Sequence, residues 1–484
     1  MSAPPEVRDL RPRRRLATSV GFLVLGHVAT VAVGLASVIV VSRLLGEEAL
    51  GRWRLAQAIV AYMTVAADLG LTTLAVREIA RRGAAVEHYA GPVLILRLTV
   101  GMILTVVAIA GLQLAAPRDA AMFYAVAFLA VIPNSLSLVH VLQGQERLGT
   151  FALVRLATTA VAGALGLLSL VLTRELIALV VWPLAMGLLV DAWLVWVTVR
   201  RLKVRLVRGD PAVWATLVRG ALPFLIGAVA VQLIANADAV IIGSIRGEAQ
   251  LGMYAAAYLV AGQLLFLWVP LAAAVYPRLA SLHQSGSRFA MALQELTGAL
   301  GLIVLPFCIG AAVLAGHVVR TLYGQRYPEV APLLAILLAM PAIGFYNVAL
   351  QHGLNAAGRQ RVVMRVSLAA AGISVVANLV VVSTIGLTGA AVTAVVVEVV
   401  TAVLYTLSAA DLAGFRPLRA YLAPLLPAAV LGGVALAADR AGLVLPVVVV
   451  AAAAAYVVLI GLRPPPAVAT LLGILRGLGR SGVR

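Results

Sequence analysis

Apolar residues fill most of the chain in stretches of about 20 residues, and short polar segments rich in arginine separate them. About 20 residues of α-helix cross the hydrocarbon core of a bilayer, so each stretch has the length of one transmembrane helix. We count fourteen stretches, beginning with 19–42 and ending with 443–462. The pattern predicts an all-α polytopic membrane protein with about 14 transmembrane helices.

A hairpin pattern joins two apolar stretches at two places in the chain, 201 residues apart. The first copy reads LLGEEALGRW at 44–53 and the second reads IRGEAQLGMY at 245–254. Five positions match, in the pairs Gly46 and Gly247, Glu47 and Glu248, Leu50 and Leu251, Gly51 and Gly252, and Trp53 and Tyr254. A duplicated hairpin indicates that the chain contains two related halves.

The repeat continues beyond the hairpins, because LQGQERLGTFALVR at 142–155 resembles LNAAGRQRVVMR at 354–365. Each half has an even number of spans, so the two halves have the same orientation and form a parallel repeat. The predicted segments are a basic cytoplasmic N-terminus at 1–18, a first lobe of helices 1–6 at 19–199, an amphipathic cytoplasmic linker at 200–219, a second lobe of helices 7–12 at 220–410, helices 13 and 14 at 411–462, and a basic cytoplasmic tail at 463–484.

Basic residues are distributed unequally between the two faces of the predicted membrane domain. If the N-terminus is cytoplasmic, the cytoplasmic segments hold 26 of the 37 Lys and Arg residues and the opposite face holds nine. Cytoplasmic loops of membrane proteins carry the excess of positive charge, so both termini are predicted to be cytoplasmic. In the linker, Asp210 and Pro211 have the order of an N-cap and a first helical residue, which predicts an amphipathic helix over 205–219 at the membrane surface.

Composition agrees with this class and excludes several others. The chain is 63% hydrophobic and 12% charged, whereas an average soluble domain is about half apolar and about a quarter charged. The net charge of +18 comes from arginines in the loops. The chain has no basic segment interleaved with aromatic residues, so we expect no nucleic-acid partner. The single cysteine, Cys308, excludes an intramolecular disulfide and a Cys-ligated metal cluster. The sequence contains no P-loop, HExxH or GxSxG motif, so we expect no enzyme activity and no cofactor or metal.

Charged and amide side chains inside the predicted spans are the candidates for chemistry, because such groups are costly in a bilayer and normally face a cavity or a partner. A guanidinium group suits an anionic ligand such as phosphate or pyrophosphate, and an amide group can hydrogen-bond a polar ligand; the candidates are Arg97, Arg155, Arg365 and Asn236. The acids are candidates for coupling to an ion gradient or for lining a cavity, and they are Asp238, Glu398, Asp68 and Asp191.

Structural pairing is the alternative for most of these residues. An ion pair of Arg97 with Asp68, and of Arg155 with Asp191, would explain four charges without a ligand. Arg365 lies near a loop, where its side chain can reach the interface.

The remaining acids lie deeper in their spans. Asp238 is near mid-span, and its alternatives are a salt bridge to an arginine across the two halves or a cavity. Asn236 is two residues away and does not share its helix face. Glu398 has no partner that the sequence predicts.

Several segments resemble the polysaccharide-biosynthesis flippases, the O-antigen and lipid-linked oligosaccharide translocases. The segments are SRLLGEEALGRW, DLGLTTLAVREIARR, ADAVIIGSIRGEAQLGMYAAAY, LNAAGRQRVV and IGLTGAAVTAVVVE, and the resemblance covers about 19–462. This superfamily also contains multidrug and toxin extruders. The resemblance implies two lobes around a central cavity that opens alternately to the two sides of a bacterial plasma membrane. Its flippase branch implies an undecaprenyl-diphosphate-linked oligosaccharide as substrate, with membrane lipids, a polymerase and glycosyltransferases as partners.

Three other functions remain open at this point. A cation-coupled multidrug exporter of the same fold would need an acidic and aromatic site, whereas this chain has intramembrane arginines and 6% aromatics. A membrane glycosyltransferase or polymerase would need a substantial outer loop with catalytic residues, and the longest outer loop here has about a dozen residues. A scaffold without transport activity is the third.

Overall fold

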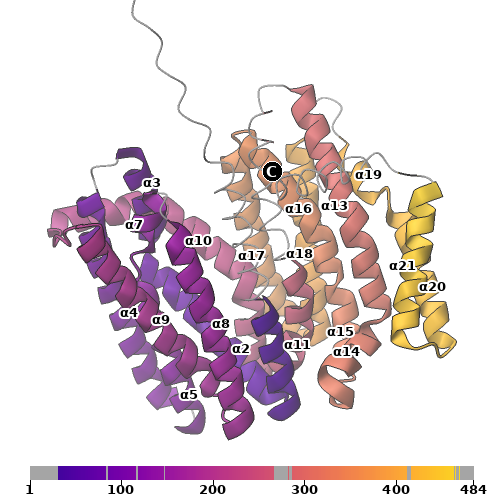
Figure 1. Cartoon of the computed structure of the whole chain (residues 1–484), viewed down its shortest axis with the longest axis horizontal. Coiled ribbons are helices and arrows are strands. Elements are labelled where there is room, and N and C mark those ends of the chain that lie inside the picture. Colours follow the sequence, from indigo (N-terminus) through magenta and orange to yellow (C-terminus); the bar gives the residue numbers. More distant parts are fainter. Residues whose placement is uncertain are drawn as a thin grey trace, which may run out of the picture.

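The computed structural model describes residues 31–82, 86–115, 118–145, 148–265, 286–410 and 416–462, together with 279, 282, 464 and 468. Across these residues the chain is almost entirely helical and contains no strand (Figure 1). The predicted N-terminal segment 1–18, part of the first and eighth stretches, and nearly all of the tail at 463–484 lie outside the described residues. The all-α prediction is confirmed.

The first group of helices follows the chain from the first stretch to the linker. It contains the apolar helix Val31–Leu44, α2 (Glu47–Asp68), α3 (Leu71–Arg82), α4 (Val86–Ala115), α5 (Arg118–Phe128), α6 (Val131–Leu136), α7 (Val139–Gly144), α8 (Leu148–Thr173), α9 (Ala178–Trp196) and a π-helical turn at Val197–Arg201. α2 and α3 form one apolar span that bends by 46° at the break between them.

The second group contains α10 (Pro211–Arg246), α11 (Glu248–Leu265), α13 (Ser287–Val313), α14 (Ala315–Tyr323), a 3₁₀ turn at Gly324–Arg326, α15 (Val330–Leu337), α16 (Ala339–Ala356), α17 (Gln360–Thr384), α18 (Leu387–Ser408), α19 (Pro417–Leu422), α20 (Leu425–Arg440) and α21 (Leu445–Leu462). In the described ranges, eleven helices are long and apolar enough to cross a membrane, and the bent α2–α3 pair brings the number to twelve. These twelve coincide with predicted stretches. The first and eighth stretches leave the described residues, so the total of fourteen stays a prediction.

The helix predicted to begin at Asp210 does begin there. The Asp210 carboxylate accepts a hydrogen bond from the Val213 amide at 2.8 Å, and Pro211 is the first helical residue. The structure shows no separate linker helix over 205–219, because α10 runs without interruption for 36 residues, a length of about 54 Å. Its first turns bury Leu217 and Ala221 against α3, and this packing continues the helix through the predicted boundary at 219.

The two groups of helices form two lobes whose ribbons meet at the repeated hairpins and diverge toward the end that carries α3 and α7 (Figure 1). α10 crosses between them, packing on α3 near its start and on α2 and α17 further along. α20 and α21 lie at the edge of the second lobe, away from the first, and expose apolar side chains such as Val449, Val450 and Val457. An exposed apolar face is expected where a helix contacts lipid.

The repeated hairpins face each other at the contact between the lobes. Gly46 and Gly247 begin their hairpins with the same unusual backbone, at φ values of 91° and 85°, which disfavours residues with a Cβ. A Cβ placed on Gly51 would lie 1.7 Å from the carbonyl oxygen of Glu248, and a Cβ on Gly252 would lie 1.8 Å from that of Glu47. These two contacts are equivalent under the 201-residue offset, so the repeat found in the sequence is also a symmetry of the packing.

Candidate functional site

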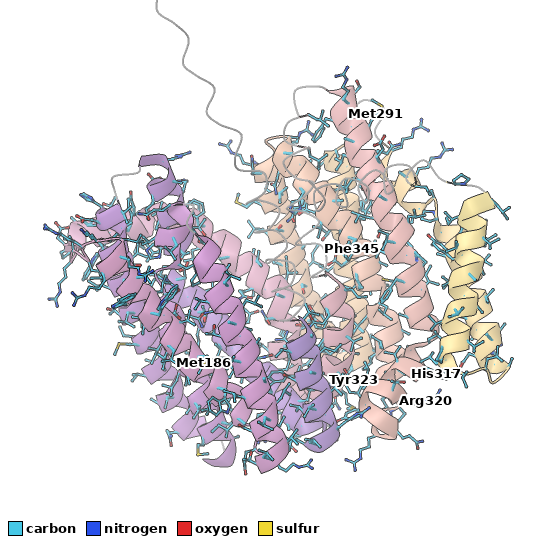
Figure 2. All side chains as sticks on the ribbon, in the orientation of Figure 1. Met186, Met291, His317, Arg320, Tyr323 and Phe345 are labelled. Carbon is cyan, nitrogen blue, oxygen red and sulfur yellow. The ribbon has the colours of Figure 1, made fainter. Side chains whose placement is uncertain are left out.

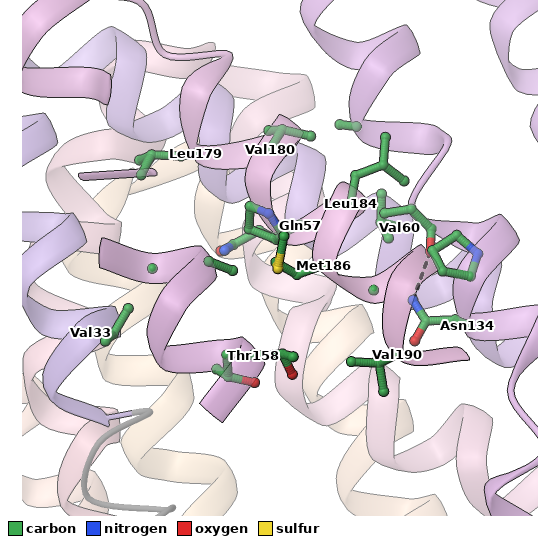
Figure 3. A pocket seen from close by; sticks show the side chains of 18 of the residues that line it. Val33, Gln57, Val60, Asn134, Thr158, Leu179, Val180, Leu184, Met186 and Val190 are labelled. Atoms are coloured by element: carbon green, nitrogen blue, oxygen red, sulfur yellow. Dashed lines mark hydrogen bonds between the residues drawn. The ribbon is translucent and has the colours of Figure 1, made fainter. Parts of the chain in front are cut away.

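A cavity of about 430 Å³ lies inside the first lobe, between helix Val31–Leu44, α2, α6, α8 and α9 (Figure 3). Most of its lining is apolar, including Val60, Leu184, Met186 and Val190. The polar lining comes from Ser37, Trp53, Gln57, Asn134, Arg155, Thr158, Thr159 and Asp191. A mostly apolar pocket with a few convergent polar groups has the composition of a small-molecule site.

Helical periodicity explains which residues reach this cavity. On α8, Arg155, Thr158, Thr159 and Ala162 line it, and this spacing of three, four and seven residues places them on one helix face. The lining residues of α2 and α9 are spaced in the same way. Small residues such as Ala162 and Gly187 provide part of the space, because larger side chains at these positions would extend into the cavity. Met186 of α9, which is labelled in Figure 2 as well, marks the place of this cavity within the first lobe.

Arg155 and Asp191 are the two charged residues of the cavity wall. Asp191 is only 2% exposed and accepts a hydrogen bond from Ser137, whereas Arg155 is exposed. The two side chains interact electrostatically, but no direct ion pair joins them, and the Asp191 Oδ1 atom has no hydrogen-bond partner among the described residues. Arg155 and Asp191 therefore line the same cavity, as the predicted pair would, but they do not form a direct ion pair.

Arg97 occupies a structural position beside the cavity. Its guanidinium is 3.0 Å from the Asp68 carboxylate and donates hydrogen bonds to the carbonyl of Ser137, at 2.8 Å, and to that of Asn134. The helical conformation is interrupted between α6 and α7 at this point. The carbonyl groups at the end of α6 lack partners within the helix, and the Arg97 guanidinium supplies hydrogen-bond donors for them. Arg97 is 5% exposed, and the ion pair with Asp68, which was the alternative to a ligand role, accounts for both charges.

A second polar cluster lies under the contact between the lobes. Arg54 of α2 donates to the side-chain oxygen of Asn236 on α10 at 2.9 Å, and the Asn236 amide donates to Gln232 at 2.8 Å. Asp238 accepts a hydrogen bond from the Tyr254 hydroxyl of α11 at 2.8 Å and is 6% exposed. Asn236 and Asp238 thus contact different partners, as their two-residue spacing predicted.

Arg54 belongs to this cluster but is not among the residues that the sequence singled out, because it lies directly after the first hairpin, at the end of an apolar stretch. α2 begins at Glu47, so Arg54 lies two turns inside the helix and is 7% exposed. Its position next to the repeated hairpin was the signal available in the sequence.

Glu398 and Arg365, the remaining candidates, lie in the second lobe. The Glu398 carboxylate of α18 accepts a hydrogen bond from the Asn347 amide of α16 at 2.6 Å, a partner that the sequence did not predict. Arg365 is exposed near the start of α17. The structure does not bring either residue to the first-lobe cavity, and across the described ranges no three His, Cys, Asp or Glu side chains are placed to hold a metal ion.

Comparison with solved structures supports the same architecture. The lipid II flippase MurJ in an inward closed conformation has a similar fold, with a TM-score of 0.73, 12% identity, and coverage of 90% of this chain and 97% of that one. An inward-facing multidrug resistance MATE family transporter gives a TM-score of 0.61 at 16% identity, covering 79% and 95% of the two chains. A MOP superfamily transporter from Pyrococcus furiosus gives 0.54 at 14% identity, covering 84% and 99%. At these identities the likeness concerns the fold alone.

Comparison of the sequence itself identifies the family. A search of curated proteins found no significant match. The model of the family described as "Polysaccharide biosynthesis protein" matches residues 16–283, more than half of the chain. The chain belongs to the polysaccharide biosynthesis protein family.

Proposed function

We propose that this protein is a flippase that moves an undecaprenyl-diphosphate-linked oligosaccharide, an O-antigen or exopolysaccharide repeat unit, from the inner to the outer leaflet of a bacterial plasma membrane. The proposal is supported by the family and the architecture together. The chain belongs to a polysaccharide biosynthesis family, and its two repeat-related lobes meet at one symmetric hairpin contact. Apart from α10, which packs on both lobes, the contact lies at the hairpin end, and such a contact can separate while the opposite ends of the lobes approach, which is the motion of alternating access.

The candidate arginines fall into two groups, those with an ion-pair partner among the described residues and those without one. Arg97 is matched by Asp68 and by two carbonyls, so we assign it no ligand. Arg155 lines a cavity, and Arg365 is exposed with no ion pair in the part of the chain that the structure describes. We propose Arg155 for substrate contact and Arg365 for the diphosphate. Asn236 stays a candidate through its place in the cluster between the lobes.

Asp238 and Glu398 are the proposed coupling acids, since both are intramembrane carboxylates held by neutral hydrogen-bond donors. Protonation of such a carboxylate would change its hydrogen bonds, and in Asp238 it would change them at the contact between the lobes. If neither acid couples transport to a gradient, the Asp238→Asn and Glu398→Gln variants will keep full transport and the pH dependence of the wild type.

Reconstitution tests the function directly. Proteoliposomes containing the protein and a fluorescent undecaprenyl-diphosphate oligosaccharide should expose the glycan on the opposite leaflet, where an added glycosidase removes the label. Arg365→Gln should slow this step more than Arg365→Lys does, because the lysine keeps a positive charge for the diphosphate. Flipping at the rate of protein-free liposomes would contradict the proposal. A control lipid with one phosphate and no glycan tests whether the movement depends on the sugar.

A cation-coupled multidrug exporter is the second candidate, because MATE transporters share this fold. The cavity of the first lobe disfavours it, since the acid of its wall, Asp191, is accompanied by Arg155, and Trp53 is the one aromatic residue among the lining residues. Export of a fluorescent cation by the same proteoliposomes, without flipping of the lipid-linked glycan, would favour the exporter. We also propose that the flippase works beside a polysaccharide polymerase and glycosyltransferases, and that it has no catalytic activity of its own.

A further inference from the structure

We propose that the first-lobe cavity is a carbohydrate subsite that holds a neutral sugar ring of the substrate, at a distance from the group that binds the diphosphate. The proposal rests on the proposed function, because it assigns one part of that substrate to one part of the molecule. The cavity of about 430 Å³ is within the range of small-molecule sites, and its polar groups come from five different helices: helix Val31–Leu44, α2, α6, α8 and α9.

Charge at the cavity wall disfavours an ionic ligand of either sign. A diphosphate would face one guanidinium, Arg155, but also one carboxylate, Asp191, and the nearby Arg97 is already paired with Asp68. An organic cation would face the same two charges in the opposite sense. Placing a net charge where the wall is neutral leaves it without a matching counter-charge, at a desolvation cost. A neutral ligand avoids this cost.

Hydrogen-bonding capacity at the wall favours a ligand rich in hydroxyl groups. Arg155 offers donors only, the Asp191 carboxylate offers acceptors only, and Gln57 offers both. A sugar hydroxyl donates one hydrogen bond and accepts others, so the hydroxyl groups of a ring match donor and acceptor groups alike. The Asp191 Oδ1 atom lacks a partner among the described residues, and an unpartnered buried acceptor is costly until a donor reaches it.

The shape of the lining fits a ring with one apolar face. Gln57 and Met186 lie toward the middle of the cavity, with Thr158 near one end and Leu179 and Val180 near the other (Figure 3). Trp53 contributes an aromatic surface to the same wall. A pyranose presents polar edges and apolar C–H faces, so its edges can contact Arg155 and Gln57 while a face packs on the apolar residues.

Cysteine labelling tests the subsite without the lipid. Cys308 is the single native cysteine, so a Cys308→Ser background carrying Thr159→Cys reports on the cavity alone. The probes are free glucose, galactose and N-acetylglucosamine, with pyrophosphate, tetraphenylphosphonium and lysine as anionic, cationic and zwitterionic comparisons. A sugar at about ten times its Kd should slow the reaction of Thr159→Cys with a water-soluble maleimide by about tenfold. The exposed Glu175→Cys, outside the cavity, should react at an unchanged rate.

Two variants in the wall make the test specific. Gln57→Ala and Asp191→Asn should each raise the Kd for the protecting sugar by about tenfold, because each removes or weakens a hydrogen bond to a hydroxyl. Gln57 is exposed, so its variant should fold normally even if Asp191→Asn does not. Protection by pyrophosphate, tetraphenylphosphonium or lysine in place of the sugars, or by none of the probes, would overturn the subsite.

The flipping assay separates this failure from failure of the proposed function. If sugars protect Thr159→Cys but the lipid-linked oligosaccharide does not move, the subsite stands and the flippase assignment falls. If Gln57→Ala flips the substrate at the wild-type rate and no sugar protects the cysteine, the flippase stands and the subsite falls.

Discussion

Arg52 and Glu248 form an ion pair across the contact between the two lobes, with the guanidinium Nε 2.8 Å from the carboxylate. Arg52 also contacts Glu48 at 3.0 Å, and Tyr124 of α5 donates its hydroxyl to the second oxygen of Glu248. At the 201-residue offset Arg52 corresponds to Met253, so the repeat supplies this ion pair once and not twice. The contact of Gly51 and Gly252 is therefore symmetric, whereas the charged contact of Arg52 with Glu248 occurs once, where α2 and α5 meet α11.

The ion pair should stabilise the closed hairpin contact only modestly. Its side chains are 26% and 21% exposed, and solvent screens pairs of this kind. We expect a coupling energy of about 0.5–1 kcal/mol between Arg52→Gln and Glu248→Gln in a double-mutant cycle on thermal unfolding of the detergent-solubilised protein. The same pair of variants should accelerate cysteine crosslinking at the opposite end of the lobes if the hairpin contact opens. Glu48→Gln is the matched control, since Glu48 is exposed and lies within the first lobe. A coupling energy of zero would mean that the pair does not hold the lobes together.

Replacing Gly51 or Gly252 by alanine should separate the hairpins. The added Cβ would lie 1.7 or 1.8 Å from a backbone carbonyl oxygen, which cannot rotate away, so the helices must move apart. Overpacking of a close contact costs about 1–3 kcal/mol, and we expect a lower melting temperature for either variant.

Gly227→Ala is the control for this prediction. Gly227 is also helical, in α10, and a methyl group added there would have no neighbouring atom within 4 Å, so alanine should be neutral or slightly stabilising at this position. Equal melting temperatures for Gly51→Ala and Gly227→Ala would show that the two hairpins are further apart than the structure places them.

Removing one member of the Arg97 and Asp68 pair should be more damaging than removing both. Asp68→Asn leaves the buried guanidinium of Arg97 without the carboxylate that it contacts. Breaking a fully buried pair costs about 3–5 kcal/mol, and we expect a smaller loss here because the Asp68 side chain is 23% exposed. The double variant Asp68→Asn with Arg97→Met removes the uncompensated charge and should recover part of the loss.

Thermal unfolding and expression yield measure the effect. Arg365→Gln is the control for loss of a single arginine, and because Arg365 is exposed its unfolding free energy should change by less than about 0.5 kcal/mol. A double variant less stable than Asp68→Asn would argue that Arg97 acts mainly through the carbonyls of Asn134 and Ser137.

Tyr254→Phe should destabilise the cluster around Asp238. The hydroxyl of Tyr254 is the side-chain donor to the Asp238 carboxylate, both residues are buried, and loss of a hydrogen bond to a buried acceptor costs about 1–3 kcal/mol. Tyr62→Phe is a matched comparison, because the Tyr62 hydroxyl donates to the Gln232 carbonyl at 3.2 Å from a half-buried position. The melting temperature should fall more for Tyr254→Phe. The reverse order would indicate that the Gln232 side of the cluster holds the lobes.

The membrane class, the helices and the hairpin repeat could be predicted from the sequence because each is a pattern of residue types along the chain and depends on no contact between helices. The length of an apolar stretch indicates a span, the order of Asp210 and Pro211 indicates a helix start, and the match between Gly51 and Gly252 indicates a duplicated turn. The continuity of α10 could not be predicted in the same way. Its first turns are polar enough to lie at an interface, and only packing of Leu217 and Ala221 on α3 joins them to the span.

The residue types of the candidate site could be predicted from the sequence, whereas its contacts could be proposed only as alternatives to a ligand role. The sequence named Arg97, Arg155, Asp191 and Asp238 but left a ligand and a structural partner open for each, because helical periodicity determines the face of a residue and not the helix that this face meets. Only the tertiary structure decided for the Arg97 and Asp68 pair, gave Asp238 the hydroxyl of Tyr254, and placed Arg155 and Asp191 around a cavity. A cavity depends on the distances between helices that are remote in the chain, and those distances are set by packing.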